Sequence, residues 1–429
     1  MDLIEWCLAL RVIGDFHIHS RFSRATSPAL NLQSLAENAR IKGLDLLGTG
    51  DITHPKWLLE VSEQLEDNNG IFHLKSNKGK SPKFVITSEV ATVFQHDGKS
   101  RKIHHCLLLP DLESAKQLSG KLKQKGNLEE DGRPILNMTA AELVEILKGI
   151  SSDAEVYPAH AWTPWWSLFG ANFGFDSLKE CYQEYHSEIH ALETGLSSDP
   201  PMNWRISELD KLTLLSNSDC HSAYPFRLGR EANILELENL TYSSLINAIR
   251  GKGRSKVVST IETKPEYGKY HWTGHRNCGV SFAADESKRI GAKCPKCGKK
   301  LTRGVEERVS ELANRPIGFK ANGAAGYIYA YPLQELIRET MGESNPLSKN
   351  VQQLYDKAIA ALKNEFNITL FALISSVREV LGKEIAQIIA SVRNDTAEII
   401  PGYDGVYGKL NLTAKEERHP SKKGLDVWI

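Results

Sequence analysis

The sequence has no net charge, because its 53 lysine and arginine residues balance its 53 aspartate and glutamate residues. It also contains no apolar run that approaches the roughly 20 residues of a membrane-spanning helix. Its first residues include Asp2 and Glu5, where a secretory signal peptide carries positive charge. These absences argue against a membrane or secreted protein, and we expect an intracellular, cytoplasmic location.

Cysteine is also scarce, with seven residues in a chain of 429. Three of them cluster at Cys278, Cys294 and Cys297, and the others are scattered, which does not fit the disulfide framework of a secreted domain. A hydrophobic content of 41% with 25% charged residues is that of a soluble globular protein. The length exceeds that of one ordinary domain, and no internal repeat or long low-complexity linker is evident.

What the first half does contain is a recurring combination of a short apolar run and a metal-ligand side chain. Nearly every run is followed by Asp, Glu or His at the point where a buried strand would end: Asp15–His19, Gly50–Asp51, Glu89, His104–His105, His160, Glu193 and Asp219–His221. Such runs, separated by helical patterns, predict parallel strands with crossover helices. In a barrel of that kind the strand ends converge on one face, so one pocket would collect these residues.

The chemistry of this pocket follows from the residue types. His17 and His19 are two apart on a strand, so both project from one face and can hold one ion. Histidine and carboxylate together suit zinc, manganese or iron, and a carboxylate can bridge two ions. Neighbouring ions lower the pKa of a shared water and stabilise the attacking and leaving oxygens of a phosphoester. The pattern therefore predicts metal-dependent phosphoester hydrolysis.

The ordered motifs around these residues resemble those of the polymerase and histidinol phosphatase (PHP) superfamily. They are Asp15-Phe16-His17-Ile18-His19-Ser20, Glu89, His105 before an apolar strand, Pro158-Ala159-His160 and Ser218-Asp219-Cys220-His221. The resemblance implies a distorted seven-stranded α/β barrel with a two- or three-metal site. It assigns the first ion to His17, His19, Glu89 and Asp219, with Glu89 bridging to a second ion held by His105 and His160.

Some ligands stay open at this point. His104 and His105 point to opposite faces of a strand, so only one of them can be a ligand. A third ion would include His221 and either Asp51 or His54, and we favour Asp51 because it comes first after its strand. Asp219 and His221 are the predicted catalytic residues.

A second metal site is predicted from two short motifs, His275-x-x-Cys278-Gly279 and Cys294-x-x-Cys297-Gly298. The two-residue gap and the following glycine let both members of a motif face one ion, which favours a structural zinc site. His271 is the alternative to His275 as fourth ligand. Around this module, between residues 251 and 303, basic residues outnumber acidic ones, as in surfaces that bind polyanions.

An aromatic stretch, residues 162–169, follows the predicted ligand His160 and contains three tryptophans. Exposed aromatics beside a metal site can stack on an extruded nucleobase. Burial under the rim of the barrel is the equally favoured alternative.

Further along, apolar residues three and four apart predict helices over 306–314, 332–341, 351–364 and 370–391. The barrel motifs, the zinc module with Tyr270 and His271, the segment 311–316 and the segment 402–408 together resemble the endonuclease Q family over almost the whole chain. That resemblance implies a nucleoid-associated DNA repair enzyme. Such an enzyme flips a deaminated base (uracil, hypoxanthine or xanthine) or an abasic site and hydrolyses the phosphodiester 5′ to it.

We therefore expect a PHP phosphoesterase domain over 1–260, a zinc-binding module over 261–305, a helical domain over 306–412 and a tail over 413–429. Zn²⁺ is expected in the structural site, and Zn²⁺, Mg²⁺ and Mn²⁺ are alternatives for the active site. The expected state is a monomer that binds damaged DNA and no membrane. Two rival functions are a small-molecule phosphoesterase of the histidinol-phosphatase type and a non-catalytic, metal-stabilised DNA-binding module.

The last residues of the chain carry apolar side chains beyond a charged stretch. The spacing of Lys422, Leu425, Trp428 and Ile429 resembles the sliding-clamp-binding peptide, with Lys422 in the place usually held by Gln. A few aromatic and aliphatic anchors dominate such interfaces. The sequence thus predicts a sliding clamp as a partner, and docking of the tail on the protein's own surface is the alternative.

Overall fold

The computed structural model describes residues 9–77 and 82–411. The first part of the chain contains strands and helices in this order: β1 (Leu10–Asp15), α1 (Leu32–Lys42), β2 (Leu46–Gly48), α2 (Pro55–Gln64), β3 (Leu65–Asn68), β4 (Ile71–Leu74), β5 (Lys83–His96), β6 (Lys99–Leu109), α3 (Leu112–Leu122), β7 (Ile135–Leu136), α4 (Ala140–Ile150), β8 (Glu155–Pro158), α5 (Leu178–Tyr182), β9 (Ala191–Glu193), α6 (Pro200–Asn203), β10 (Thr213–Leu215), β11 (Ala232–Leu237), α7 (Tyr242–Ile249) and β12 (Lys256–Glu262).

The remaining elements belong to the second part of the chain: β13 (Thr273–His275), β14 (Val280–Phe282), α8 (Ala284–Ile290), α9 (Val305–Leu312), β15 (Gly326–Tyr329), α10 (Leu333–Met341), α11 (Lys349–Leu362), α12 (Ile374–Leu381), α13 (Lys383–Arg393), β16 (Ile399–Ile400) and β17 (Lys409–Leu410). The helix predicted over 370–391 is two helices, because Gly382 lies between α12 and α13 with a positive φ that glycine permits (φ 88°, ψ 169°).

An 11-stranded sheet is mixed, not the all-parallel arrangement that the apolar runs predicted, and β9 and β10 pair parallel in a separate two-stranded sheet. β1 pairs parallel with β2, and β2 with β5, whereas β1 with β11, β5 with β6, and β6 with β8 are antiparallel. The β5–β6 pair is a hairpin whose turn is Asp97-Gly98, and both turn residues have positive φ, at 50° and 70°. An Asp-Gly pair with this geometry makes a two-residue hairpin, which forces its strands to be antiparallel.

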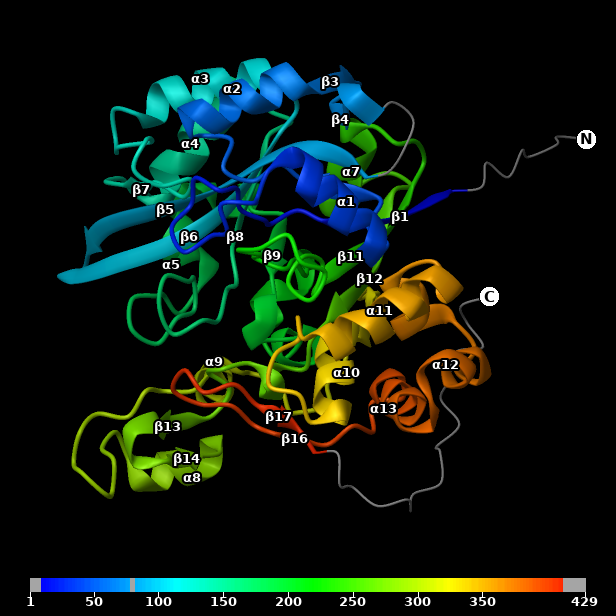
Figure 1. Cartoon of the computed structure of the whole chain (residues 1–429). Helices are drawn as coiled ribbons and strands as arrows, with labels where there is room; N and C mark the ends of the chain where they lie inside the picture. The colour runs from blue at the N-terminus through cyan, green and yellow to red at the C-terminus, as the bar shows by residue number, and fades with distance from the viewer. Residues whose placement is uncertain (1–8, 78–81, 412–429) are drawn as a thin grey trace, which may run out of the picture.

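Helices α1 to α4 pack against one face of these strands (Figure 1). α1 begins at Asn31, whose side chain accepts a hydrogen bond from the Ser34 backbone, and ends before Gly43 in the left-handed region. α4 begins with a capping box between Thr139 and Glu142. These signals position the amphipathic helices so that their apolar faces bury the outside of the sheet.

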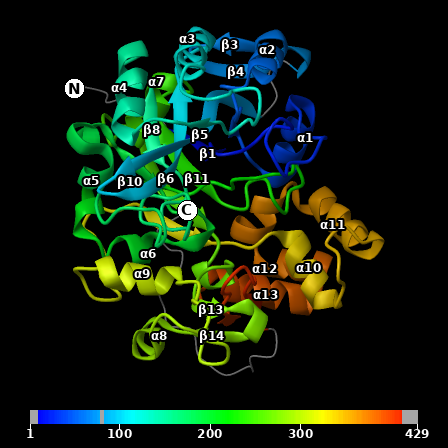
Figure 2. The ribbon, with the colours of Figure 1, turned by 90° about the vertical axis from the view of Figure 1, so that its left-hand side faces the viewer.

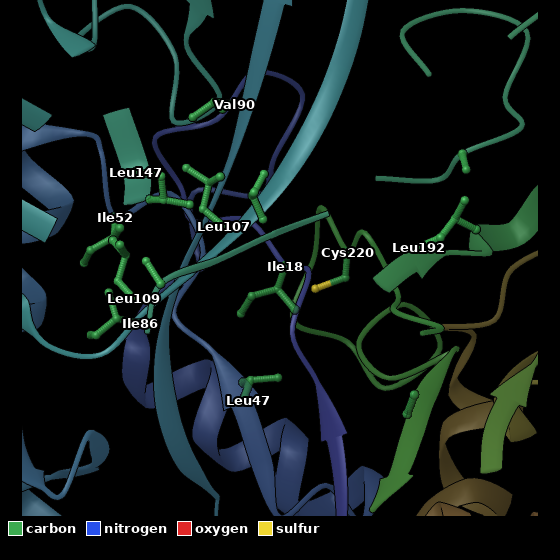
Figure 3. Close-up of a cluster of buried hydrophobic side chains, with 14 of the residues drawn as sticks. Ile18, Leu47, Ile52, Ile86, Val90, Leu107, Leu109, Leu147, Leu192 and Cys220 are labelled. Atoms are coloured by element: carbon green, nitrogen blue, oxygen red, sulfur yellow. The ribbon is translucent and has the colours of Figure 1, made fainter. Parts of the chain in front are cut away.

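Each metal motif has an apolar side that anchors it in this core. Ile18, between His17 and His19, is buried, and so is Cys220, between Asp219 and His221. The two residues form a parallel β-bridge, and Figure 3 shows them side by side among buried aliphatic chains. Because side chains alternate along an extended chain, burying Ile18 and Cys220 directs their neighbours to the opposite face.

The second part of the chain lies on one side of the sheet. In Figures 1 and 2 the β13–β14 hairpin with α8, and the helices α10–α13, both lie below the strands. β15 returns to the main sheet and pairs parallel with β12. A buried ion pair between Lys42 of α1 and Glu365, with Nζ and Oε1 2.7 Å apart, connects the first part of the chain to the helical region. Among the described residues, none of the helices has the length and apolarity needed to traverse a lipid bilayer.

Candidate metal centre

His17 and His19 are held in matching ways by two buried carboxylates. The Nδ1 atom of His17 lies 3.0 Å from Glu193 Oε1, and Nδ1 of His19 lies 2.9 Å from Asp51 Oδ1. This leaves the Nε2 atom of each ring facing the carboxylates of Glu89 and Asp219. A histidine that binds metal through one nitrogen commonly has its other nitrogen fixed by a carboxylate in this manner.

Glu89 lies at the centre of the site. Its Oε2 atom is 3.3 Å from His17 Nε2 and 3.2 Å from His19 Nε2. Its Oε1 atom is 2.7 Å from His104 Nδ1 and 3.3 Å from His160 Nε2. One carboxylate therefore connects two groups of ligand atoms, which is the arrangement of a bridging ligand.

The donor atoms fit divalent ions. In each of two groups the donor atoms lie within 4.8 Å of one another, namely His17, His19, Glu89 and Asp219 in one and Glu89, His104 and His160 in the other. His17 Nε2 is buried and forms no hydrogen bond among the described residues, although carboxylate oxygens are nearby. A buried ring nitrogen that faces carboxylates without a hydrogen bond is satisfied when it coordinates an ion.

The electrostatics agree with this fit. Burial alone would raise the pKa of Glu89, but the neighbouring His104, Arg133 and His17 hold it well below its usual range. Burial likewise opposes a charged His19, yet the neighbouring Asp51 and Asp219 raise the pKa of its ring. The cluster thus attracts positive charge strongly, and a bound metal ion would replace the protons on its histidines.

The structure brings together the four residues predicted for the first ion, but it corrects the second group. His104, and not His105, faces Glu89 and His160. Across the β5–β6 hairpin Glu89 pairs with Cys106, and His104 shares the face of Cys106 because side chains alternate along the strand. His105 points the other way, where its nitrogens contact the Thr92 and Tyr182 hydroxyls.

Asp51 also differs from its predicted role in a third ion site. One of its oxygens contacts His19, and the other accepts hydrogen bonds from the Ser20 backbone and side chain and from Ser23 Oγ. Asp51 therefore lies behind His19 and orients its ring. Its alternative, His54, stacks on Phe22 at a ring distance of 4.5 Å and lies outside both ligand groups.

His221 lies at the mouth of the site. Its Nε2 atom is 3.5 Å from Asp219 Oδ1, and its ring centre is 4.7 Å from that of His19. The side chains of His221 and Asp219 are each 33% exposed, whereas His17, His19 and Glu89 are almost fully buried. These two residues are the part of the predicted set that a substrate in solution can contact directly.

Three site residues have strained backbones. Asp51, His160 and Asp219 all have positive φ, at 47°, 31° and 46°. Non-glycine residues adopt this conformation at a cost, and such strain concentrates at functional sites. Each of them follows the end of a strand, β2, β8 or β10, so the chain turns sharply there and directs the side chain into the common pocket.

The four side chains predicted for the structural zinc site lie close together. His275, Cys278, Cys294 and Cys297 place one ligand atom each within 4.8 Å of one another. Gly279 and Gly298, which follow the two motifs, have positive φ of 61° and 74°, so each motif ends in a turn that glycine permits. Although burial opposes it, hydrogen bonds from the Lys296 and Cys297 backbones lower the pKa of Cys294 to about 7. His271 lies outside this group of ligand atoms.

The aromatic stretch after His160 contains both buried and partly exposed tryptophans. Trp162 is buried and its ring lies 4.6 Å from that of Phe169. Trp166 is half-buried, and its ring centre is 5.2 Å from that of His104. The Nζ atom of Lys102 lies over the Trp166 and Phe173 rings. One tryptophan therefore supports the rim of the barrel, while another lies beside the metal ligands with a cation next to it.

One charged residue of the site was missed by the sequence analysis. Arg133 Nη1 lies 3.2 Å from Glu89 Oε2. Arg133 belongs to a short Gly-Arg-Pro turn between α3 and β7, away from the strand ends that drew attention to the other residues. A single sequence carries no signal that would connect this turn with the metal ligands.

Comparison with known proteins agrees with the geometry. The crystal structure of the lesion-specific endonuclease PfuEndoQ from Pyrococcus furiosus matches with a TM-score of 0.84 and 34% identity, over 95% of this chain and 98% of that chain. A crystal structure of endonuclease Q, in complex with a 27-mer duplex substrate with an abasic lesion at the active site, matches with a TM-score of 0.84 and 35% identity, over 95% and 99% of the two chains.

The carboxyl-terminal helices match a separate family model. Residues 332–396 match the family described as the MJ0043 C-terminal domain. The MJ0043 protein of Methanocaldococcus jannaschii is 33% identical over 276 residues, or 63% of this chain. The match spans only 34% of that relative, about a third of its length. The full-length agreement with the two crystal structures confirms the predicted α/β fold and shows that this chain belongs to the endonuclease Q family.

Proposed function

We propose that this protein is a DNA repair endonuclease that hydrolyses the phosphodiester 5′ to a deaminated base or an abasic site. The observation that carries the proposal is Glu89, whose two oxygens face two separate groups of metal ligands. Membership of the endonuclease Q family supports the substrate class, since one endonuclease Q structure holds duplex DNA with an abasic lesion at its active site.

The ligand sets follow from the contacts. His17, His19, Glu89 and Asp219 would hold one divalent ion, and Glu89, His104 and His160 a second. Zn²⁺ suits this mixture of imidazole and carboxylate, and Mg²⁺ or Mn²⁺ are alternatives that metal analysis distinguishes. When bound, such ions lower the pKa of water and stabilise the oxygens of a phosphoester during displacement.

The protein's own residues orient this chemistry. Glu193 and Asp51 fix the rings of His17 and His19, so that both Nε2 atoms stay aligned without substrate. Asp219 and His221, at the exposed mouth, contact the reacting groups, and His221 Nε2 is placed to accept or give a proton there. In the reaction the oxygen of a water molecule bonds to phosphorus and one P–O ester bond breaks. A proton from that water passes to the departing oxygen.

The zinc module would hold DNA and take no part in the chemistry. Its four ligands form a closed set, which is the pattern of structural zinc. Its many lysines and arginines suit contacts to phosphates. We propose the division into a phosphoesterase domain (1–260), this module (261–305) and a helical domain (306–412) as the basis for truncation experiments.

We also propose that a sliding clamp binds the tail. Lys422, Leu425, Trp428 and Ile429 lie outside the described residues, so the proposal rests on their spacing alone. Deleting residues 425–429 should abolish co-elution with the clamp and leave cleavage of short oligonucleotides intact. Unchanged co-elution would contradict the proposal.

The enzymatic proposal is tested with matched 5′-labelled duplexes that contain uracil, hypoxanthine, an abasic site or no lesion, each with Zn²⁺, Mg²⁺ or Mn²⁺. We expect one cut 5′ to each lesion and none in the undamaged duplex. Hydrolysis of small phosphate monoesters without cutting of lesion DNA would instead support the histidinol-phosphatase type.

A further inference from the structure

Arg133, in the segment 131–136, places its guanidinium group beside the candidate metal ligands. Arg133 Nη1 lies 3.2 Å from Glu89 Oε2, and its side chain retains 22% exposure. It is therefore close to both ligand groups that share Glu89 and is open to the solvent from which a substrate arrives. Other nearby arginines differ: Arg24 forms an ion pair with Glu130, and its side chain is 60% exposed.

The backbone around Arg133 is fixed on both sides. Asp131 Oδ1 accepts hydrogen bonds from the backbone N–H of Arg133 and of Arg24, at 3.1 and 3.2 Å. Gly132 donates to the carbonyl of Phe22, and a Cβ atom on Gly132 would lie 2.4 Å from the Asp51 carboxylate. On the other side, the carbonyl of Pro134 accepts from the Ala91 N–H, and β7 pairs with β5. Such anchoring preorganises the side chain between them.

Once metal ions are bound, they neutralise the carboxylates of the site, and these carboxylates no longer need the positive charge of Arg133. The guanidinium of an arginine stays charged at physiological pH, so Arg133 keeps its positive charge beside Glu89. With two divalent ions present, the same carboxylates are shared with those ions, and a partly buried extra cation is unfavourable without an anion. A phosphodiester supplies that anion, and a guanidinium matches its oxygens through two parallel hydrogen bonds.

We propose that Arg133 is a catalytic residue that hydrogen-bonds a non-bridging oxygen of the scissile phosphate and stabilises its charge in the transition state. This inference rests on the proposed function. Asp51 is engaged by His19, Ser20 and Ser23, so Glu89 is the carboxylate of the site that the Arg133 guanidinium contacts. Preorganised donors of this kind are typically worth about 100-fold to 1,000-fold in rate.

The first test compares Arg133→Met and Arg133→Lys with the control Arg24→Met. Single-turnover cleavage of an abasic-site duplex is measured at saturating enzyme, with melting temperature and bound metal determined for each variant. We expect Arg133→Met to be slower by roughly 100-fold, Arg133→Lys to be intermediate, and the control to keep the wild-type rate. Bound metal should be unchanged in every variant. Loss of metal from folded Arg133→Met or Arg133→Lys would overturn the proposal, because Arg133 would then act only through Glu89.

The second test changes the substrate. A methylphosphonate at the scissile position replaces one non-bridging oxygen by a methyl group and removes the negative charge, and its two isomers at phosphorus are assayed separately. If Arg133 contacts that oxygen, the methylphosphonate and Arg133→Lys should not lower the cleavage rate independently. For one isomer, the combined loss of rate should be at least tenfold smaller than the product of the two separate losses. Additive losses for both isomers, or a wild-type rate for Arg133→Met, would overturn the assignment. Failure of the wild-type protein to cut the unmodified duplex would instead contradict the proposed function itself.

Discussion

Glu89 and His104 face each other across the β5–β6 hairpin, with Glu89 Oε1 2.7 Å from His104 Nδ1. His105, one residue further, lies on the other face of the strand and contacts Tyr182. Two adjacent histidines of one strand therefore have different roles. The first belongs to a group of side chains that could hold a metal ion, and the second packs on the other face of the strand.

The first prediction uses this pair. His104→Gln should lose one of the two proposed active-site ions and slow cleavage by more than about 10-fold. Even the residues that hydrogen-bond to metal ligands typically change activity by about 10-fold to 100-fold. His105→Gln should keep both ions, because its ring lies outside the ligand groups, and should mainly lower the melting temperature. Elemental analysis gives the metal content of both variants, and melting curves give their stability. Loss of metal from His105→Gln alone would reverse the assignment.

The second prediction concerns the zinc module. Cys297→Ser should release one zinc per chain and weaken DNA binding, because the ion contributes directly to the folding of a small module. His271→Gln is the control, since His271 is buried nearby but outside the ligand group. Zinc content and DNA affinity are measured for both. Equal zinc content in wild type and Cys297→Ser would show that these four side chains do not hold an ion.

The third prediction concerns pH and stability. Glu231 and Glu262 are fully buried, and both lie within about 3.2 Å of the single Ser216 hydroxyl, which can donate to only one of them. Burial, together with nearby acidic groups, raises the pKa of Glu262 to about 8 and that of Glu231 well above its usual value. The folded state thus holds protons that the unfolded chain releases near pH 4.5.

Stability should therefore fall as pH rises from about 4.5 through about 8, because the folded-state pKa lies above the unfolded one. Glu262→Gln mimics the protonated form and should flatten this dependence by on the order of a few kcal/mol across the range. Glu238→Gln, on a half-exposed carboxylate, is the control. Denaturant unfolding of metal-loaded protein between pH 6 and 9 checks this prediction, and parallel curves for wild type and Glu262→Gln would contradict it.

Much of the site could be predicted from sequence because its ligands follow apolar strands. His17, His19, His160 and Asp219 follow the ends of strands that converge on one face, whereas Glu89 lies within β5 and joins the same group from the β5–β6 hairpin. The side chains His275, Cys278, Cys294 and Cys297, which we propose as zinc ligands, could be grouped from their local spacing alone. The Asp97-Gly98 turn, by contrast, carried a hairpin signal that the parallel interpretation overlooked.

The remaining assignments depended on three-dimensional register. Alternation along β6 shows that His104 and His105 face opposite ways, but only the pairing of Glu89 with Cys106 tells which faces the site. Asp51 is a typical metal ligand by residue type, and only its contacts with His19, Ser20 and Ser23 reveal a supporting role. Arg133 reaches Glu89 from a turn that no strand pattern marks.

Asp219→Asn tests most directly whether this cluster holds metal ions that cleave damaged DNA. The amide has nearly the shape of the carboxylate but is a poor metal ligand, so the fold and the structural zinc should persist. With an abasic-site duplex we expect affinity within a few-fold of wild type and single-turnover cleavage reduced by at least about 100-fold. Cleavage at a near wild-type rate by Asp219→Asn would contradict the account.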